Sequence, residues 1–238
     1  MDKQLDRIKL KLGQLKEFDK KLTLFGSEKH KYNFGIPLTS EVIREFETRH
    51  NIKLPIEFVD FYTTFGNGGA GPFYGLEPLE NVLFDDLDYK RKDNLLNPSK
   101  PFPHTKPWNV EFTSTVSEDD DEEEYERQYF EFSKDLMNGA LAICNYGCGI
   151  SLNLVVNGEE FGHIWTDDRG NDGGIYPSTE LGNKDKINFL DWYELWLDNS
   201  LVEIANKIKA TPIMPQPIQT EQKIETKFEN KPWWKFWA

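Results

Sequence analysis

Two passages with glycine-rich turns, at 54–79 and 139–168, constrain this chain more than any other part of the sequence. The first predicts an apolar helix that stops at the turn Asn67-Gly68-Gly69 and is followed by a short strand at 73–76. The second predicts three strands joined by tight turns. Neither passage contains a recognisable set of catalytic residues. The pair therefore points toward a fold that presents a surface to a partner.

The strands of the second passage are expected to be antiparallel, because short turns join them. We expect them at 141–145, 150–156 and 161–165. Asn157-Gly158 lies between the last two strands and is the strongest hairpin signal in the chain. This part of the chain is therefore predicted to form an antiparallel sheet.

Four further stretches have the spacing of apolar residues that is typical of helices. They lie at about 3–24, 39–51, 54–65 and 187–208. Thr39 or Ser40 is a suitable N-cap for the second helix, and Pro55 suits the first turn of the third. The first helix is largely polar. We therefore expect residues 1–30 to be an N-terminal helical extension on a main domain at 31–210.

A long insert at about 85–134 separates the two passages. Prolines and weak periodicity predict that 81–116 is mainly loop. A continuous acidic run follows, made of Glu118, Asp119, Asp120, Asp121, Glu122, Glu123 and Glu124. Like charges repel and stay in water, so one interpretation is a solvated or disordered loop. The other is an electrostatic lure for a basic partner, because clustered charge raises association rates.

Composition narrows the class of partner. The 238 residues carry a formal net charge of −13 with a pI of about 4.8, which argues against binding nucleic acid or anionic membranes directly. Two cysteines are too few for a disulfide framework. The charged start of the chain has no secretory apolar region, and no run of about 18 apolar residues exists. We therefore expect a cytoplasmic protein.

Three motifs superficially suggest a calcium loop, a phosphate-binding loop and a zinc site. The stretch 165–173 lacks the acidic residue that closes a calcium loop, and the glycines at 67–71 follow a helix rather than open one, so a phosphate cradle is not expected. A zinc site at Cys144, Cys148 and His163 lacks a fourth ligand. We expect no metal, no cofactor and no catalytic residue. A thiol hydrolase using Cys148 and His163 stays as the enzymatic alternative.

The end of the chain changes character at 211–238, which is predicted to be a polar, Pro-rich linker and an aromatic tail. The tail, KPWWKFWA, has four aromatic residues among its eight. It could pack on its own domain, dock into another protein, or sit at a membrane interface. With two lysines on a strongly acidic chain, stable membrane binding is the weakest of these hypotheses.

The order of these features resembles the SUKH superfamily, in particular its Smi/Knr-like branch. The matching residues are Ile52, Leu54, Pro55, Phe58, Phe61, Tyr62, Asn67, Gly68, Gly69, Leu76, Leu79, Gly147, Gly149, Gly162, Ile164 and Trp165, with the aromatic helix at 189–197. The resemblance covers about 37–200. It implies an α+β domain with helices packed around a central, mostly antiparallel sheet. The extra parts are the acidic insert, the N-terminal helix and the C-terminal tail.

The resemblance also implies a non-enzymatic, protein-binding function. Bacterial members are implied to be immunity proteins that block a cognate toxin, often a nuclease, and fungal members regulate cell-wall synthesis. The leading hypothesis is therefore an immunity protein that occludes a basic toxin surface, and the alternative is a regulatory scaffold or adaptor. Besides the acidic run, the predicted partner-binding residues are Tyr74, Trp165 and Asp167.

Overall fold

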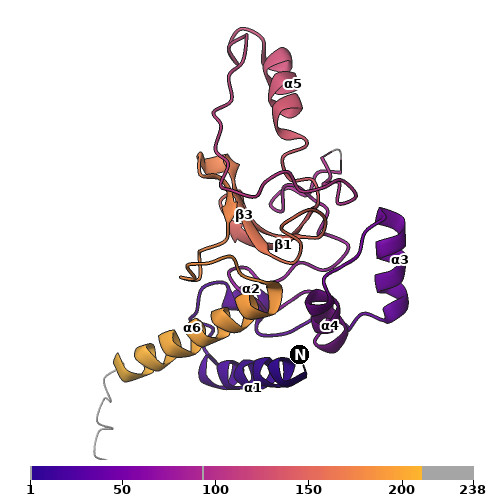
Figure 1. The fold of residues 1–238 in the computed structure, drawn as a ribbon. Coiled ribbons are helices and arrows are strands. Elements are labelled where there is room, and N and C mark those ends of the chain that lie inside the picture. Colours follow the sequence, from indigo (N-terminus) through magenta and orange to yellow (C-terminus); the bar gives the residue numbers. More distant parts are fainter. Residues whose placement is uncertain (1, 93, 211–238) are drawn as a thin grey trace, which may run out of the picture.

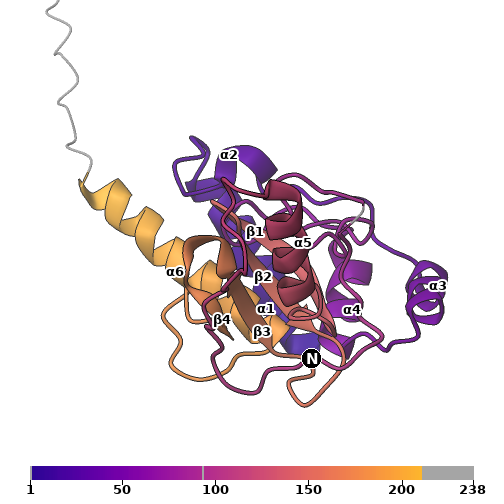
Figure 2. The same cartoon turned by 90° about the horizontal axis from the view of Figure 1, so that it is seen from above.

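The computed structural model describes residues 2–92 and 94–210, which form one α+β domain (Figures 1 and 2). The helices are α1 (Asp2–Phe18), α2 (Ser27–His30), α3 (Ser40–His50), α4 (Ile56–Thr64), α5 (Glu122–Ser133) and α6 (Phe189–Ala210). The strands are β1 (Ala140–Gly147), β2 (Ile150–Val155), β3 (Ile164–Asp168) and β4 (Gly174–Pro177). They form one antiparallel sheet in the order β1-β2-β3-β4. The predicted α+β class and antiparallel sheet are confirmed.

The sheet is buried on both faces, because side chains alternate along each strand and both sets are apolar. In β1, Leu141 and Ile143 enter the larger core, which lies against the helices. Ala140 and Ala142 enter a second, smaller core on the opposite face. All four side chains are fully buried. The strands therefore separate two cores rather than closing one.

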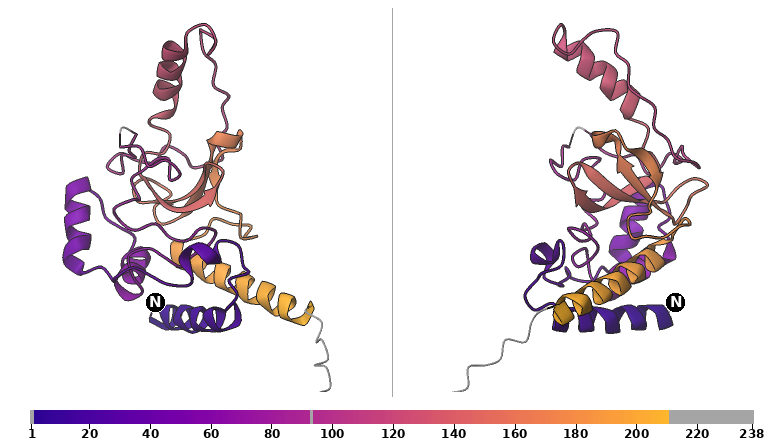
Figure 3. Two further views of the ribbon diagram at one scale, coloured as in Figure 1. Left: turned by 180° about the vertical axis from the view of Figure 1, so that it is seen from behind. Right: turned by 90° about the vertical axis from the view of Figure 1, so that its left-hand side faces the viewer.

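The helical face is built in two layers. Figures 1 and 3 show α4 and α6 between the sheet and α1. From α6, Trp192 and Tyr193 are fully buried, and the Tyr193 hydroxyl donates to the Ala70 carbonyl at 2.8 Å. From α1, Ile8 and Leu15 are fully buried in the same core. The predicted N-terminal extension is therefore an integral layer of the domain.

The opposite face is covered by irregular chain instead of helices. Leu87, Leu96 and Phe102 come from this covering segment and pack in the smaller core. The Trp165 ring lies at the centre of that core, 5.0 Å from the ring of Phe102. The prediction that 81–116 is mainly loop agrees with this arrangement.

Helix starts and stops follow the expected local chemistry. The Thr39 hydroxyl accepts from the Val42 N–H at 3.4 Å and caps α3. Asn51 ends α3 in the left-handed region, at φ 51°. α4 begins directly after Pro55. These boundaries were readable from the sequence because each depends on a few neighbouring residues.

One turn prediction and one strand prediction were wrong. Asn157-Gly158 is not a two-residue hairpin, because residues 156–163 form a longer connection between β2 and β3. The tight hairpin lies at Cys148-Gly149, where both residues have positive φ, as a type I′ turn requires. The expected strand at 73–76 is also absent, and Leu76 makes only isolated bridges to Gly69 and Cys144.

Four elements differ from the prediction, and one of them is the short helix α2, which was not predicted. The first helix ends at Phe18, several residues before the predicted end. β4 was not predicted, because Gly174–Pro177 is too short to show a period. α5 was not predicted either, and it occupies part of the run that we expected to be a loop. The tail at 211–238, for which we made three hypotheses, lies outside the described residues.

α1 is attached to α6 by a carboxylate that lies between the two helices. Arg7 donates to both oxygens of Glu194, at 2.8 and 2.7 Å, and the Lys11 ammonium lies 2.9 Å from the same group. The Glu194 side chain is 11% exposed. The hydrogen bond from Arg7 is the main reason that the pKa of Glu194 falls to about 2. The ionised carboxylate therefore stabilises the docked state of α1.

We predict that Glu194→Gln lowers the free energy of unfolding by about 1–2 kcal/mol at pH 7, since Arg7 is half exposed and the interaction is partly screened. The pKa is lowered on folding, so this stabilisation is present above about pH 4.5. It is lost as the pH falls toward 2. Urea unfolding of the variant should therefore show a smaller loss of stability between pH 5 and pH 2.

Glu203→Gln is the matched control, because Glu203 is on the same helix but is 55% exposed in its pair with Lys207. It should keep the pH dependence of the unsubstituted protein. If the two variants behave alike, the contact between α1 and α6 does not depend on the ionised Glu194.

Candidate partner-binding surface

An arm made of α5 and a non-helical leg projects from the sheet and carries most of the excess charge of the protein. It consists of residues 109–134, here called the acidic arm, and includes α5 (Figure 1). The arm contains ten carboxylates and two cations, Arg127 and Lys134. Its net charge is therefore −8, against −13 for the whole chain. The acidity is concentrated in one projecting element.

α5 forms within the acidic run because its first turn favours negative charge. The Asp121 side chain accepts from the Glu124 N–H at 3.1 Å and caps the helix. Glu122, Glu123 and Glu124 then occupy the first turn, where the helix dipole stabilises anions. A hydrogen bond from Arg127 is the main cause that lowers the pKa of Glu124 to about 2. The carboxylates of this turn thus help to form the helix.

The two legs of the arm are joined by aromatic and polar contacts. The Phe112 ring lies 5.3–5.4 Å from the rings of Tyr125, Tyr129 and Phe132 on α5. Gln128 accepts from the Thr115 N–H at 2.9 Å. No residue of α5 is fully buried. The arm is therefore a thin, two-legged element whose own contacts hold its legs together.

Grooves run along both sides of α5. One has a volume of about 660 Å³ and is lined by Trp108, Phe112 and Phe132, among others. The other, of about 310 Å³, is lined by Glu118, Glu126 and Phe130, among others. Tyr129 and Phe130 are 43% and 45% exposed. The arm thus presents aromatic rings beside its carboxylates.

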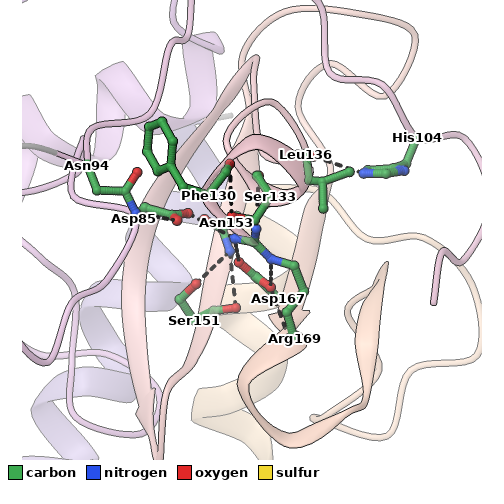
Figure 4. A network of polar contacts seen from close by, with 10 residues as sticks. All are labelled: Asp85, Asn94, His104, Phe130, Ser133, Leu136, Ser151, Asn153, Asp167 and Arg169. Atoms are coloured by element: carbon green, nitrogen blue, oxygen red, sulfur yellow. Dashed lines mark hydrogen bonds and ion pairs between the residues drawn. The ribbon is translucent and has the colours of Figure 1, made fainter. Parts of the chain in front are cut away.

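The base of the arm is anchored by Arg169, which follows β3 (Figure 4). Its Nε and Nη2 atoms donate to the two oxygens of Asp167, at 2.8 and 2.6 Å. Nη2 also donates to Asp85 at 3.0 Å, and Nη1 donates to the carbonyl of Ser133 at 3.2 Å. Ser133 is the last residue of α5. One guanidinium therefore ties the arm, the insert and the sheet together.

This anchor is a desolvated charge cluster. The side chains of Arg169, Asp167 and Asp85 are 13%, 8% and 19% exposed. Burial by itself lowers the pKa of Arg169, but the carboxylates of Asp167 and Asp85 outweigh it and raise that pKa above its ordinary value. Burial raises the pKa of Asp85, against the attraction of Arg169. The planar fork of arginine suits this two-carboxylate geometry, and a lysine lacks it.

A second exposed aromatic group lies around Tyr74 and is here called the Tyr74 patch. It consists of Phe25, Phe73, Tyr74 and Tyr146. The Phe25 ring lies 5.2 Å from Tyr74, and the Phe73 ring lies 4.1 Å from Tyr146. The Lys29 ammonium lies 5.0 Å from the centre of the Tyr74 ring. Gly147 allows the close approach, since a Cβ at this position would lie 2.8 Å from the Tyr74 ring.

A family model for the SMI1 / KNR4 family (SUKH-1) matches residues 37–180, more than half of the chain. The chain belongs to this family. The predicted resemblance is thereby confirmed, and the match spans α3 to β4 with the acidic arm inside it. SUKH-type domains serve toxin immunity or cell-wall regulation, often by binding partner proteins, and are generally non-catalytic. No curated protein and no solved structure matches the chain.

The structure of this SUKH-1 protein separates the predicted contact residues into three groups. Glu118, Asp119 and Asp120 are exposed at the start of α5, and Asp121 to Glu124 form its cap and first turn. Tyr74 is 36% exposed. Trp165 is fully buried, and Asp167 is held by Arg169. The last two cannot meet a partner where they stand, so their role is in the core and in the anchor.

Sequence reasoning missed the aromatic side of the arm and the anchor. Tyr125, Tyr129 and Phe132 are spaced four and three residues apart, which is a helical stripe that the dense charge obscured. Asp85 and Arg169 are 84 residues apart, and no local pattern joins them.

The enzymatic alternative is not supported by the geometry. Cys148 lies in the turn before β2, and His163 pairs with Val155 at the end of β2. The length of a strand therefore separates them. Within 2–92 and 94–210, no group of three metal-ligating side chains gathers, and none of the helices has the length and apolar character that a membrane crossing requires. The backbone N–H groups of Gly69 and Ala70 donate to carbonyls of the chain itself.

We predict that Arg169→Met lowers the free energy of unfolding by about 3–5 kcal/mol, because Asp167 and Asp85 are left as buried, unpaired carboxylates. Arg169→Lys should lower the free energy of unfolding by a smaller amount, because lysine keeps the positive charge but lacks the planar, forked guanidinium. Urea unfolding measures the change. Hydrogen exchange at 133–136 should rise in the same variants.

Arg127→Met is the control within the arm. Arg127 is 62% exposed in its pair with Glu124, so the substitution should leave the free energy of unfolding close to that of the unsubstituted protein. Equal stability of the Arg169 and Arg127 variants would remove Arg169 as the anchor.

Proposed function

We propose that this SUKH-1 protein is an immunity protein that neutralises a cognate toxin by binding and occluding it. The observation that carries the proposal is the acidic arm, a projecting element with a net charge of −8 and a buried anchor at its base. Family membership supports a protein-binding role. The anchored base gives the arm a defined direction from the sheet.

The charge of the arm favours a toxin that acts on nucleic acid. Such a toxin needs a basic surface to neutralise phosphates. Carboxylates spaced along a helix are complementary to that surface and would raise the association rate. Bound there, the arm would occupy the site that the nucleic acid needs. The expected partner is therefore a protein with a basic surface. This binding requires neither nucleic acid nor a membrane.

Affinity needs desolvated anchors as well as charge, because buried aromatic residues dominate interfaces. Tyr129 and Phe130 lie on α5 itself, next to the carboxylates. Tyr74 is the proposed anchor outside the arm. Trp165 takes no part in this contact, since the core covers it.

A regulatory scaffold or adaptor, such as one for cell-wall synthesis, is the alternative within the same family. Co-expression with the toxin encoded beside this chain separates the two. Cells that survive expression of the toxin because this chain is present support the immunity function. Unprotected cells, with both proteins present and folded, reject immunity for that pair.

For the purified pair, we predict that Asp119→Asn, Glu122→Gln and Glu123→Gln together slow association at least about tenfold at low salt. These three carboxylates have no ion pair or hydrogen bond among the described residues. The Asp121 cap and the Arg127–Glu124 pair stay in place, so the helix should remain folded. The salt dependence of the association rate should weaken. Stopped-flow or surface plasmon resonance at several salt concentrations measures both.

The charge-matched control is Asp6→Asn, Glu45→Gln and Glu159→Gln. These residues are exposed and lie outside the arm. The control should leave the association rate close to that of the unsubstituted protein. If both triple variants slow association equally, net charge rather than the arm is responsible.

A further inference from the structure

The Tyr74 patch leaves aromatic side chains exposed that contribute little to the core of the domain. Phe25 is 60% exposed and Tyr74 is 36% exposed. The Phe25 ring also lies 6.4 Å from both Phe73 and Tyr146. Grouped exposed aromatic residues are typical of surfaces that another segment covers.

A shallow pocket of about 710 Å³ adjoins the patch. Its lining comes from the loop at 21–24, from Gly26, Glu28 and Lys29 around α2, and from Tyr74. Lys29 supplies a cation beside the Tyr74 ring. A site of this kind suits flat aromatic side chains, which gain from apolar burial and from cation–π contact.

The last helix ends beside this pocket. The Lys207 ammonium donates to the carbonyl of Thr23, a residue of the pocket wall, at 2.8 Å. α6 ends three residues later, at Ala210. Ile208 is 54% exposed, and Phe18, at the end of α1, is 53% exposed. The chain that follows Ala210 therefore starts next to an uncovered apolar surface.

We propose that residues 231–238, KPWWKFWA, dock onto the Tyr74 patch of the same chain. Four of these eight residues are aromatic, and burying large aromatic side chains is a major source of binding free energy. The 20 residues at 211–230 are polar and rich in Pro and Gln. A random coil of 20 residues has an end-to-end distance of about 25 Å, and a tether of that reach corresponds to a millimolar effective concentration at a nearby patch.

The acidic arm is the competing surface, because the tail segment carries two lysines. Figures 1 and 3 place the arm at the opposite end of the molecule from the end of α6. Reaching it within one chain would stretch the linker, whereas the Tyr74 patch adjoins its starting point. We therefore assign the tail segment to the Tyr74 patch, which lies nearer to the end of α6 than the acidic arm does.

This inference goes beyond the proposed function and does not depend on it. A partner that uses Tyr74 would have to displace the tail first, and its apparent affinity would fall by the fraction of chains with the patch uncovered.

A nitroxide label on Cys148 tests the proposal in the full chain. Cys148 is exposed and follows Gly147, which lies against the Tyr74 ring, whereas Cys144 is buried and burial raises the pKa of its thiol. The label should broaden the indole N–H signals of Trp233, Trp234 and Trp237 in the free protein. Substitution of each Trp by Phe assigns the signals.

Phe25→Ser with Tyr74→Ser should restore the three signals, while Tyr129→Ser, an exposed aromatic on the arm, should leave them broadened. The unchanged signal of buried Trp192 reports that a variant is folded, and Phe25→Ser alone is the fallback. Tail signals that the label never affects, or that stay broadened in the double variant, overturn the proposal. Broadening of an isotope-labelled chain by the nitroxide of a second copy also overturns it.

Discussion

The requirement to bury both faces of a four-stranded sheet governs this structure. Apolar side chains alternate to both sides of β1, so neither face can be left to water. Helices cover one face, where α4 and α6 supply large aromatic rings. The other face is covered by irregular chain from the insert, around Trp165. Because this covering chain is not helical, it leaves backbone carbonyls and charged side chains near the core. Arg169 donates hydrogen bonds to several of these groups.

Arg169 links that cover to the arm. Its guanidinium binds Asp167 at the edge of the smaller core, Asp85 at the start of the insert and the last carbonyl of α5. The arm has no fully buried residue in its helix, so its internal contacts hold its two legs together but do not orient it on the sheet. The anchor supplies that orientation. The acidic surface that we propose as the toxin contact thus depends on a buried ion pair that never meets the partner.

Much of the fold was predictable from local sequence. Thr39 and Asn51 bound α3, Pro55 precedes α4, and three of the four strands lie close to the expected positions. The wrongly predicted hairpin has a tertiary cause. Asn157-Gly158 has the composition of a tight turn, but the Asn157 side chain donates to the Ser99 carbonyl, and its own carbonyl accepts from the Phe102 N–H. Contact with the insert therefore overrides the local preference of that dipeptide.

The residues of the candidate site also fall into those that the sequence indicated and those that only the structure placed. The acidic run was evident from the sequence, whereas the helix within it and the stripe of Tyr125, Tyr129 and Phe132 were missed although the stripe has helical spacing. Trp165 was predicted to contact the partner. The structure places it in the smaller core, and only the path of the insert over the sheet brings about that burial.

The sequence by itself determined the class of fold, the boundaries of α3, the start of α4, the family and the concentration of negative charge. Each of these depends on residue type and on spacing within one or two elements. Tertiary structure alone decided which aromatic residues are exposed, that α1 belongs to the main core, and that Arg169 gathers Asp85, Asp167 and Ser133. The physical reason is that burial and ion pairing depend on segments far apart in the chain, whose approach no local pattern encodes.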